Sequence, residues 1–273
     1  MIPEGNRQSN VARFSGFGHH YDRYRPEAPK QVIGLLTRYL RRDPELVVDI
    51  GCGTGLSTFI WAGHAAQIIG VEPNEDMRAV ALEKWQNLGG SSEISFINGY
   101  SNQLDLASES VDIITCSQSF HWMEPVSTLQ EAGRVLKEEG IFAVYDCDWP
   151  PALDWRIEQQ YNHLIEQADV INARLTPAEE RAEKRDKNGH LGQLEQSGVF
   201  RFTRELVFHN IEVCDAERYI GILVSQGGIQ TVSKLGSHEL ADELEQFKLL
   251  VSQYFAGETL DIPMSYRMRL GIK

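Results

Sequence analysis

The chain has 273 residues, of which 42% are hydrophobic, 24% charged and 9% aromatic, and this composition excludes a disordered or fibrous protein. The formal net charge of −13 repels phosphate backbones and anionic membrane surfaces, so we expect neither a nucleic-acid nor a membrane partner. The sequence has no apolar run of about 18 residues and no Cys-x-x-Cys pair, so we expect a cytoplasmic protein without a membrane span, disulfide or metal site.

About the first twenty residues form a polar, aromatic-bearing arm, which is followed by an amphipathic helix pattern over residues 32–40. From Glu45 to Cys147, short β-branched runs then alternate with helical periods. The runs predict five strands, at residues 46–50, 67–71, 94–97, 111–116 and 141–145, with helices at 77–88 and 126–136. This alternation is typical of a parallel sheet with crossover helices.

After Trp149-Pro150-Pro151 the sequence becomes helical and rich in charge. Thr176-Pro177-Ala178-Glu179 predicts a helix start, with Thr176 as the N-cap. The run Glu183-Lys184-Arg185-Asp186-Lys187 carries both signs of charge, which favours a solvated helix face over a basic patch. Two further strands are predicted at Arg201–His209 and Met264–Ile272, with helices at 216–225 and 239–255 between them.

The most informative stretch is residues 47–56, an apolar strand that ends in Asp-x-Gly-x-Gly-x-Gly and runs into a helix. Glycines at such a turn let a ligand lie directly on the backbone. Glu72 ends the next strand, 23 residues beyond Asp49, where an acidic side chain in such folds accepts the two ribose hydroxyls of a ligand. The stretch therefore predicts a nucleoside-bearing cofactor.

The glycine spacing separates two classes of cofactor. Dinucleotide sites use Gly-x-Gly-x-x-Gly to bind a pyrophosphate, whereas here Gly51-x-Gly53-x-Gly55 follows the carboxylate of Asp49. A carboxylate repels a diphosphate but helps to hold an ammonium group, which S-adenosylmethionine carries. From about Tyr21 to Cys147, the sequence resembles the class I S-adenosylmethionine-dependent methyltransferases.

The resemblance implies a Rossmann-like methyltransferase fold, with a mostly parallel seven-stranded sheet, one antiparallel strand and helical insertions that cap the site. Residues 1–149 would form the cofactor-binding core with an N-terminal lid arm. Residues 150–190 would form a helical insertion, and residues 191–273 the last two strands with their inserted helices. The implied activity is transfer of a methyl group from S-adenosylmethionine to a small-molecule acceptor by direct displacement.

The resemblance also implies the residues that bind the cofactor. Asp49 would lie near its amino group, while Glu72 would bind the ribose. Met77 would pack against the adenine or, as the alternative, simply fill the core. Arg25 would meet the methionine carboxylate or form an ordinary surface ion pair. The full cofactor-binding set comprises Asp49, Gly51, Gly53, Gly55, Glu72, Met77, Ser101, Ser117 and Arg25.

The family often has an acidic residue after the third strand, directly after a glycine, to bind the adenine amine. Here Gly99 is followed by Tyr100, Ser101 and Asn102, so we expect backbone groups or Asn102 to serve instead.

The stretch Ser117-Gln118-Ser119-Phe120-His121-Trp122 resembles a subset of the family with Gln-x-Phe-His-Trp after the fourth strand. It falls at the carboxyl edge of the sheet, where ligands of open α/β folds bind. His121 is the candidate base or acceptor-binding group, and Tyr21 of the arm is the second catalytic candidate; a packed structural histidine is the alternative. Near the same strand ends, we expect Cys52, Cys116 and Cys147 to be small buried hydrophobes.

Two other functions remain open. A nicotinamide-dependent oxidoreductase shares the strand, the glycine loop and the acidic residue, but the glycine spacing and Asp49 oppose it. A non-catalytic cofactor-binding or regulatory protein would look identical over residues 45–120. The sequence specifies neither the acceptor nor the oligomeric state.

Overall fold

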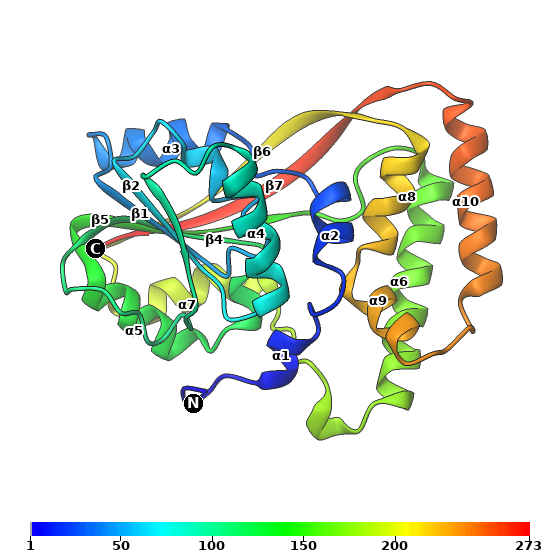
Figure 1. The fold of residues 1–273 in the computed structure, drawn as a ribbon, viewed down its shortest axis with the longest axis horizontal. Helices are drawn as coiled ribbons and strands as arrows, with labels where there is room; N and C mark the ends of the chain where they lie inside the picture. Colours follow the sequence, from blue (N-terminus) through cyan, green and yellow to red (C-terminus); the bar gives the residue numbers. More distant parts are fainter. Residues whose placement is uncertain (1) are drawn as a thin grey trace.

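The computed structural model describes residues 2–273, which fold around one seven-stranded sheet (Figure 1). The strand order is β3-β2-β1-β4-β5-β7-β6; β1 to β5 pair in parallel, and β7 is antiparallel to both of its neighbours. The predicted mostly parallel sheet with one antiparallel strand is therefore confirmed. The strands are β1 (Leu46–Ile50), β2 (Gln67–Val71), β3 (Ile94–Ile97), β4 (Val111–Ser117), β5 (Leu136–Cys147), β6 (Phe202–Cys214) and β7 (Leu260–Ile272).

Helices bury both faces of the sheet, since successive strand residues point to opposite sides. On one face, Val47 packs in a cluster with α3 (Gln31–Leu40). On the other face, Val48 packs in a cluster with α5 (Pro125–Val135) and α7 (His190–Gln196). α4 (Glu75–Asn87) lies against β3. Burial from both sides explains why the strands read as nearly continuous apolar runs in the sequence.

A second group of helices packs around its own apolar cluster, which includes Tyr161, Tyr219 and Phe247. The outer ends of the long strands β6 and β7 reach this cluster and connect the helix group to the sheet (Figure 1). Within residues 2–273 there is no helix with the length and apolarity that a membrane crossing requires. The group consists of α6 (Trp155–Leu175), α8 (Ala216–Val224), α9 (Gly227–Lys234) and α10 (Ala241–Phe255).

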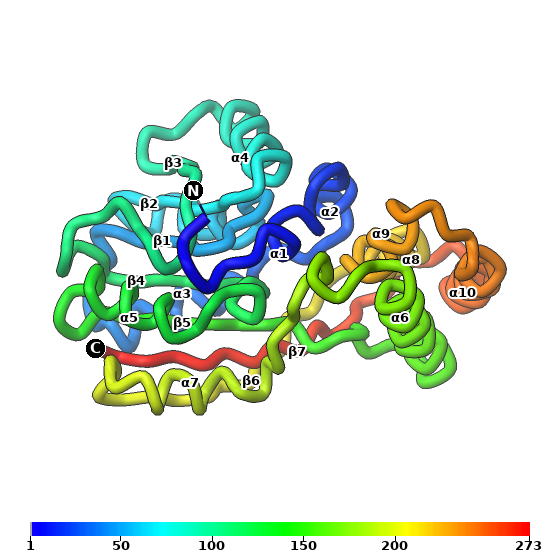
Figure 2. Tube along the Cα trace, turned by 90° about the horizontal axis from the view of Figure 1, so that it is seen from below, coloured from blue at the N-terminus to red at the C-terminus, as the bar shows by residue number. Residues whose placement is uncertain are grey.

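The N-terminal arm forms α1 (Gln8–Ala12) and α2 (Gly18–Tyr24), which lie between the sheet and the helix group (Figure 2). The amide of Asn74, at the start of α4, donates to the Val11 carbonyl at 2.8 Å. Lys84 pairs with Asp22 at 2.8 Å. The arm is thus bonded to the helix that follows β2.

The structure corrects several boundaries of the predicted elements. The last two strands are longer than predicted because their pairing continues out to Cys214 opposite Leu260. The helix predicted to begin at Thr176 is wrong: Thr176 ends α6, and only a single 3₁₀ turn, Ala178–Glu180, follows it.

The charged run 183–187 is also not a helix face. Its backbone is instead bonded across the molecule, since the Glu183 N–H donates to Asn10 Oδ1 at 2.7 Å and the Arg185 N–H donates to the His121 carbonyl at 2.9 Å. These tertiary bonds compete with helix formation in a segment that has no apolar stripe to bury.

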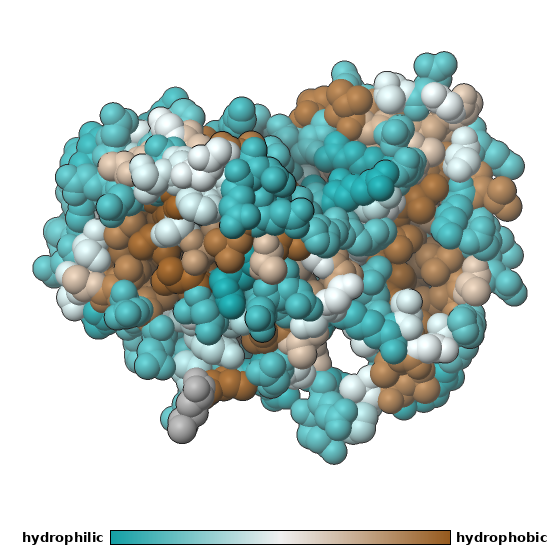
Figure 3. Space-filling view, in the orientation of Figure 1, coloured by the Kyte–Doolittle hydropathy of each residue, from teal (hydrophilic) through white to brown (hydrophobic). Residues whose placement is uncertain are grey.

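Apolar surface is exposed over the helix group (Figure 3). It includes Trp155 and Val170 of α6 and Leu249 and Tyr254 of α10. None of these four side chains lines the cavity described below.

Two glycines predict opposite effects of an added methyl group on stability. Gly55 has φ +84°, and a Cβ there would lie 2.6 Å from the Phe59 ring, so Gly55→Ala should lower the free energy of unfolding by ~1–3 kcal/mol. Gly34 lies within α3 with nothing within 4 Å of an added Cβ, so Gly34→Ala should raise the free energy of unfolding by ~0.5–1 kcal/mol. Urea denaturation measures both, and equal stability of the two variants would contradict this packing.

Candidate functional site

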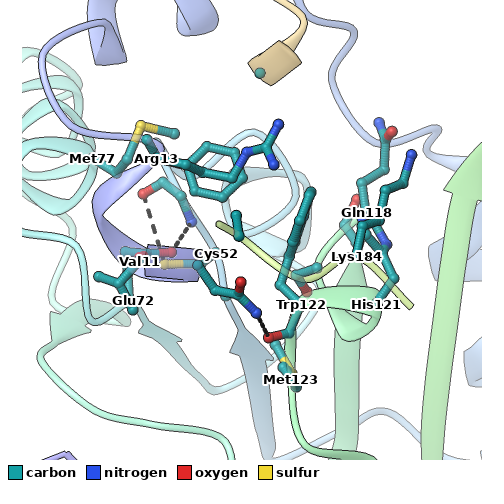
Figure 4. Close-up of a pocket in the computed structure, with 18 of the residues that line it drawn as sticks. Val11, Arg13, Cys52, Glu72, Met77, Gln118, His121, Trp122, Met123 and Lys184 are labelled. Atoms are coloured by element: carbon teal, nitrogen blue, oxygen red, sulfur yellow. Dashed lines mark hydrogen bonds between the residues drawn. The ribbon is translucent and has the colours of Figure 1, made fainter. Parts of the chain in front are cut away.

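A cavity of about 430 Å³ opens at the carboxyl ends of β1, β2 and β4. β1 lies between β2 and β4, so the strand order reverses at this place, where ligands of open α/β sheets bind. The arm and the helix group complete the walls, as Tyr21 and Gln226 show. Figure 4 shows Glu72 and Met77 on one side and His121 and Lys184 on the other.

Asp49, at the end of β1, lies beneath the cavity instead of lining it. Its side chain has no exposed surface, and its carboxylate accepts hydrogen bonds from Ser57 Oγ at 2.5 Å, Thr58 Oγ1 at 2.7 Å and Thr115 Oγ1 at 2.9 Å. Burial raises the pKa of Asp49, and the three hydroxyl bonds oppose that rise. Asp49 thus fixes the glycine loop from below, and its place near the amino group of the cofactor stays a prediction.

The glycine loop itself faces the cavity through Gly51 and Gly53. At Gly51, φ is +67°, and a Cβ would lie 2.6 Å from Cβ of Ser119, so only glycine fits between the two loops. Gly55 does not line the cavity; it allows the turn that seats Phe59. Of the three predicted glycines, two thus present backbone to the cavity and the third shapes the turn.

Glu72, at the end of β2, lines the cavity with its carboxylate held by backbone donors. Oε2 accepts from the Gly53 N–H at 2.9 Å and Oε1 accepts from the Asn74 N–H at 2.8 Å. Burial raises the pKa of Glu72 to about 7. Each oxygen keeps a lone pair, so the ionised side chain can accept two further hydroxyl hydrogens.

Met77, Ser101 and Ser117 also line the cavity, as expected. Met77 is 3% exposed, and its methyl group lies beside Gly53, so it is both core and cavity wall. Asn102 is not a lining residue, because its amide is bonded to Asn6 of the arm at 2.8 Å. The suggestion that Asn102 contacts a base is therefore corrected.

The arm brings Tyr21 and Arg25 to the cavity. Arg25 is 8% exposed and lies between the rings of Tyr21 and Trp149, at 5.2 and 4.8 Å. Its guanidinium donates to Ser225 Oγ at 2.9 Å and to the Ser225 carbonyl at 3.1 Å. The surface ion pair considered for Arg25 is thus wrong, since the side chain is buried and bonded to neutral oxygens.

His121 is 4% exposed and joins a buried cluster that the sequence did not indicate. Its Nδ1 lies 3.4 Å from Asp146 Oδ1, while Lys187 Nζ lies 2.8 Å from the same oxygen. Burial lowers the pKa of His121 to about 4, and the charge of Lys187 contributes. His121 is therefore neutral at pH 7, and Nε2 is the nitrogen left for the cavity that the ring lines.

Ligand atoms of His121, Asp146 and His190 lie within 4.8 Å of one another, a grouping that suits a metal ion. In this structure, Lys187 and, at 3.8 Å, Arg269 supply positive charge to Asp146. Burial by itself would raise the pKa of Asp146, but His121 and the charge of Lys187 hold this pKa well below its usual range. An incoming divalent cation would have to displace the Lys187 ammonium.

All four cysteines are buried and free, and burial raises the pKa of each thiol. Cys52 also lines the cavity. A thiol with a raised pKa is a poor nucleophile at neutral pH, so the expectation of small buried hydrophobes for Cys52, Cys116 and Cys147 is confirmed.

The polar cavity residues to which the sequence analysis assigned no role include Arg13, Gln118, Lys184 and Lys187. Gln118 lies in the quoted motif and has φ +52°, a strained conformation for a residue other than glycine. Its Oε1 accepts from Trp149 Nε1 at 3.0 Å. Lys184 and Lys187 were hidden in the run interpreted as a solvated helix, and no local signal marked Arg13.

Comparison with known sequences finds similarity to methyltransferases. Residues 48–144 match the family described as Methyltransferase domain. A Saccharomyces cerevisiae protein, described as a probable S-adenosylmethionine-dependent methyltransferase, is 28% identical over 50% of this chain and 47% of its own length. An uncharacterized methyltransferase of Bacillus subtilis, YcgJ, is 30% identical over 58% of this chain and 63% of its own length. The chain thus spans about half the length of the first curated relatives it matches.

Solved structures share the fold across nearly the whole chain. The crystal structure of YcgJ aligns with a TM-score of 0.54 and 18% identity, covering 90% of this chain and 99% of that one. A structure from Anaeromyxobacter dehalogenans, described as a candidate type II methyltransferase, aligns with a TM-score of 0.64 and 16% identity, covering 91% and 98%. At such identities the likeness concerns the fold, and this chain has the Rossmann-like methyltransferase fold.

The His121 cluster predicts two pKa changes of opposite sign. Removing the Lys187 charge in Lys187→Gln should raise the pKa of His121 from about 4 toward its ordinary value. Removing the carboxylate charge in Asp146→Asn should lower it further. The depressed pKa also means that stability contributed by neutral His121 is lost as the pH falls from ~6.5 toward 4. NMR titration of the ring measures each shift.

Lys30→Gln is the matched control, since it removes the same charge from an exposed position outside the cavity. A shift of His121 in this control equal to that in Lys187→Gln would contradict a local effect.

Proposed function

We propose that this chain is an S-adenosylmethionine-dependent enzyme that moves a methyl group to a small-molecule acceptor by direct displacement. The observation that carries the proposal is the oriented carboxylate of Glu72 beside the bare backbone of Gly51 and Gly53 at the carboxyl end of β1. The match of residues 48–144 supports the same conclusion.

The residues present fit the cofactor. Glu72 offers two lone pairs for a ribose diol, and Met77 supplies an apolar wall near the glycine loop for the adenine. The hydroxyl of Thr54, in the loop, is buried without a partner, so the loop contains an unsatisfied polar atom where a ligand would lie. We assign Arg25 to the methionine carboxylate, with Ser101 and Ser117 as further polar contacts.

When bound, the cofactor supplies a sulfonium-activated methyl group, which needs no covalent catalyst. The work of the chain is therefore to align the acceptor and to exclude water. We propose that His121, neutral at pH 7, accepts a hydrogen bond or proton from the acceptor through Nε2, and that Tyr21 closes the acceptor side from the arm. Asp146 positions His121 by facing Nδ1.

Small acceptors fit the geometry better than polymers. The cavity holds about 430 Å³ and is bounded by the arm, the sheet and the helix group. The chain carries a net charge of −13, which disfavours nucleic acid as the acceptor. We place the enzyme in the cytoplasm, in keeping with four free thiols.

Two alternatives are separated by direct measurements. A nicotinamide-dependent oxidoreductase would bind NAD or NADP in calorimetry, and a non-catalytic binding protein would bind S-adenosylmethionine without turnover. A methyl-transfer screen against pooled small metabolites, monitored by mass gain, should give a methylated product. A complete absence of transfer from a protein that binds the cofactor would favour the regulatory alternative.

The pKa of Glu72 predicts how cofactor binding depends on pH. Because the ionised carboxylate accepts the ribose hydroxyls, affinity for S-adenosylhomocysteine should level off above pH ~7 and fall below it by up to about tenfold per pH unit. Glu72→Gln should weaken binding by ~1–3 kcal/mol and abolish this dependence. Calorimetry across the pH range measures both effects.

Glu75→Gln is the control for this prediction, since Glu75 is an exposed carboxylate that does not line the cavity. Unchanged affinity in Glu72→Gln would refute the ribose assignment.

We also propose that the arm is a lid over the cofactor. The arm supplies Arg13, Tyr21 and Arg25 to the cavity wall. Amide hydrogen exchange over residues 10–30 should slow when S-adenosylhomocysteine binds, and deletion of residues 1–25 should reduce turnover more than thermal stability. Exchange that is already slow in the free protein, with a large loss of melting temperature on deletion, would make the arm merely structural.

A further inference from the structure

The charges that line the cavity oppose the charge of the whole chain. Five cationic side chains line it against two carboxylates, whereas the chain as a whole has a net charge of −13. Three of these cations already have partners: Arg7 pairs with Glu183, Lys187 pairs with Asp146, and Arg25 donates to Ser225. The other two cations that line the cavity are Arg13 and Lys184.

Arg13 follows α1 and reaches over the cavity toward Gln118 and Lys184 (Figure 4). Its guanidinium lies 4.3 Å from the centre of the Trp122 ring, and its Nε is buried without a hydrogen-bond partner. Burial lowers the pKa of Arg13 to about 10, and the charge of Asp169 opposes this shift. The stacking on Trp122 orients the guanidinium of Arg13 but gives its N–H groups no hydrogen-bond acceptor.

Lys184 belongs to the non-helical segment that crosses the arm. The two residues beside it are bonded through their backbone, Glu183 to Asn10 and Arg185 to His121, so the position of Lys184 is set by both neighbours. Burial lowers the pKa of Lys184, and the charges of Lys187 and Arg13 lower it further. Lys184 forms no ion pair with any residue from 2 to 273.

The carboxylates nearby do not neutralise this pair of cations. Asp169 acts on both Arg13 and Lys184 through its charge, yet it lies beyond ion-pair distance of either. Glu72 is bonded to Gly53 and Asn74 on the other side of the cavity. Arg13 is half-buried with its Nε enclosed, and Lys184 is exposed although it lines the cavity. A ligand anion at this side of the cavity would therefore pair with two cations that have no carboxylate partner.

We propose that the methyl acceptor is a small organic anion, whose carboxylate or phosphate group binds Arg13 and Lys184 on the side of the cavity near Gln118 and His121. This inference rests on the proposed function, because it assumes that Glu72 and the glycine loop hold the cofactor on the other side. The guanidinium fork of Arg13 suits the two oxygens of such an anion, and Lys184 adds a point charge.

The test measures anion binding by calorimetry on the full chain saturated with S-adenosylhomocysteine. The probes are succinate and phthalate, each against its diamide, and glycerol phosphate against glycerol. We expect anions to bind and their neutral counterparts not to bind. Comparison of the carboxylate probes with glycerol phosphate shows which of the two anionic groups the site binds.

Variants assign the binding to the two cations. Arg13→Gln and Lys184→Gln should each weaken anion binding about tenfold or more, and Arg13→Lys should restore part of it. Lys30→Gln, which removes the same charge from the exposed surface, should leave anion binding unchanged. S-adenosylhomocysteine affinity should be the same in all four variants.

Several results would overturn the proposal. Equal binding of acids and amides, no binding of any anion, or unchanged anion affinity in Arg13→Gln and Lys184→Gln would each do so. Loss of S-adenosylhomocysteine affinity in Arg13→Gln would instead assign Arg13 to the cofactor carboxylate and overturn it as well. A wild-type chain that does not bind S-adenosylhomocysteine refutes the proposed function, and repeating the anion probes on the free protein then tests the anion site separately.

Discussion

The buried carboxylate of Asp49 is the interaction on which the site depends. It lies at the centre of the sheet and accepts hydrogen bonds from hydroxyls on both sides: Ser57 and Thr58 after the glycine loop, and Thr115 on β4. The loop is thereby bonded to two strands at once. Because the loop is held from below, Gly53 can donate its N–H to Glu72 and thereby orient the second carboxylate. The three hydrogen bonds of Asp49 thus help to orient the carboxylate of Glu72, which faces the cavity.

The charged side chains beside the cavity and beneath the sheet surface are compensated in different ways. Asp146 and Asp112 are compensated by cations, Asp146 by Lys187 and Asp112 by Arg42 and Lys137. Glu72 on one side of the cavity has backbone donors alone, and Arg13 on the other has no ion-pair partner. The cavity therefore has an acid without a cation partner at one end and cations without a carboxylate partner at the other. Such polarity suits two ligands of different charge bound side by side.

The walls of the cavity come from three parts of the chain that are far apart in the sequence. The core supplies the glycine loop and the His121 turn, the arm supplies Arg13 and Arg25, and the helix group supplies Gln226. Asn10 joins the arm to the His121 turn and to the segment 183–187, because its amide donates to the Trp122 carbonyl at 2.8 Å and accepts from the Glu183 N–H. A single polar side chain of the arm thus fixes two walls of the site relative to each other.

The sequence by itself determined the α/β core, the place of Gly51, Gly53 and Glu72 at the cavity and the buried state of the cysteines. These features are local: an apolar strand, its glycine turn and the acid at the next strand end lie close in the chain, and parallel pairing carries them to one edge. Only the tertiary structure placed Asp49 below the loop and brought Asp146, His190 and Lys187 around His121. It also showed that the run around Lys184, which was predicted to be a solvated helix face, is a non-helical segment that lines the cavity. The physical reason is that these contacts join residues far apart in the chain, where burial and pairing of charges, which no local pattern encodes, decide the conformation.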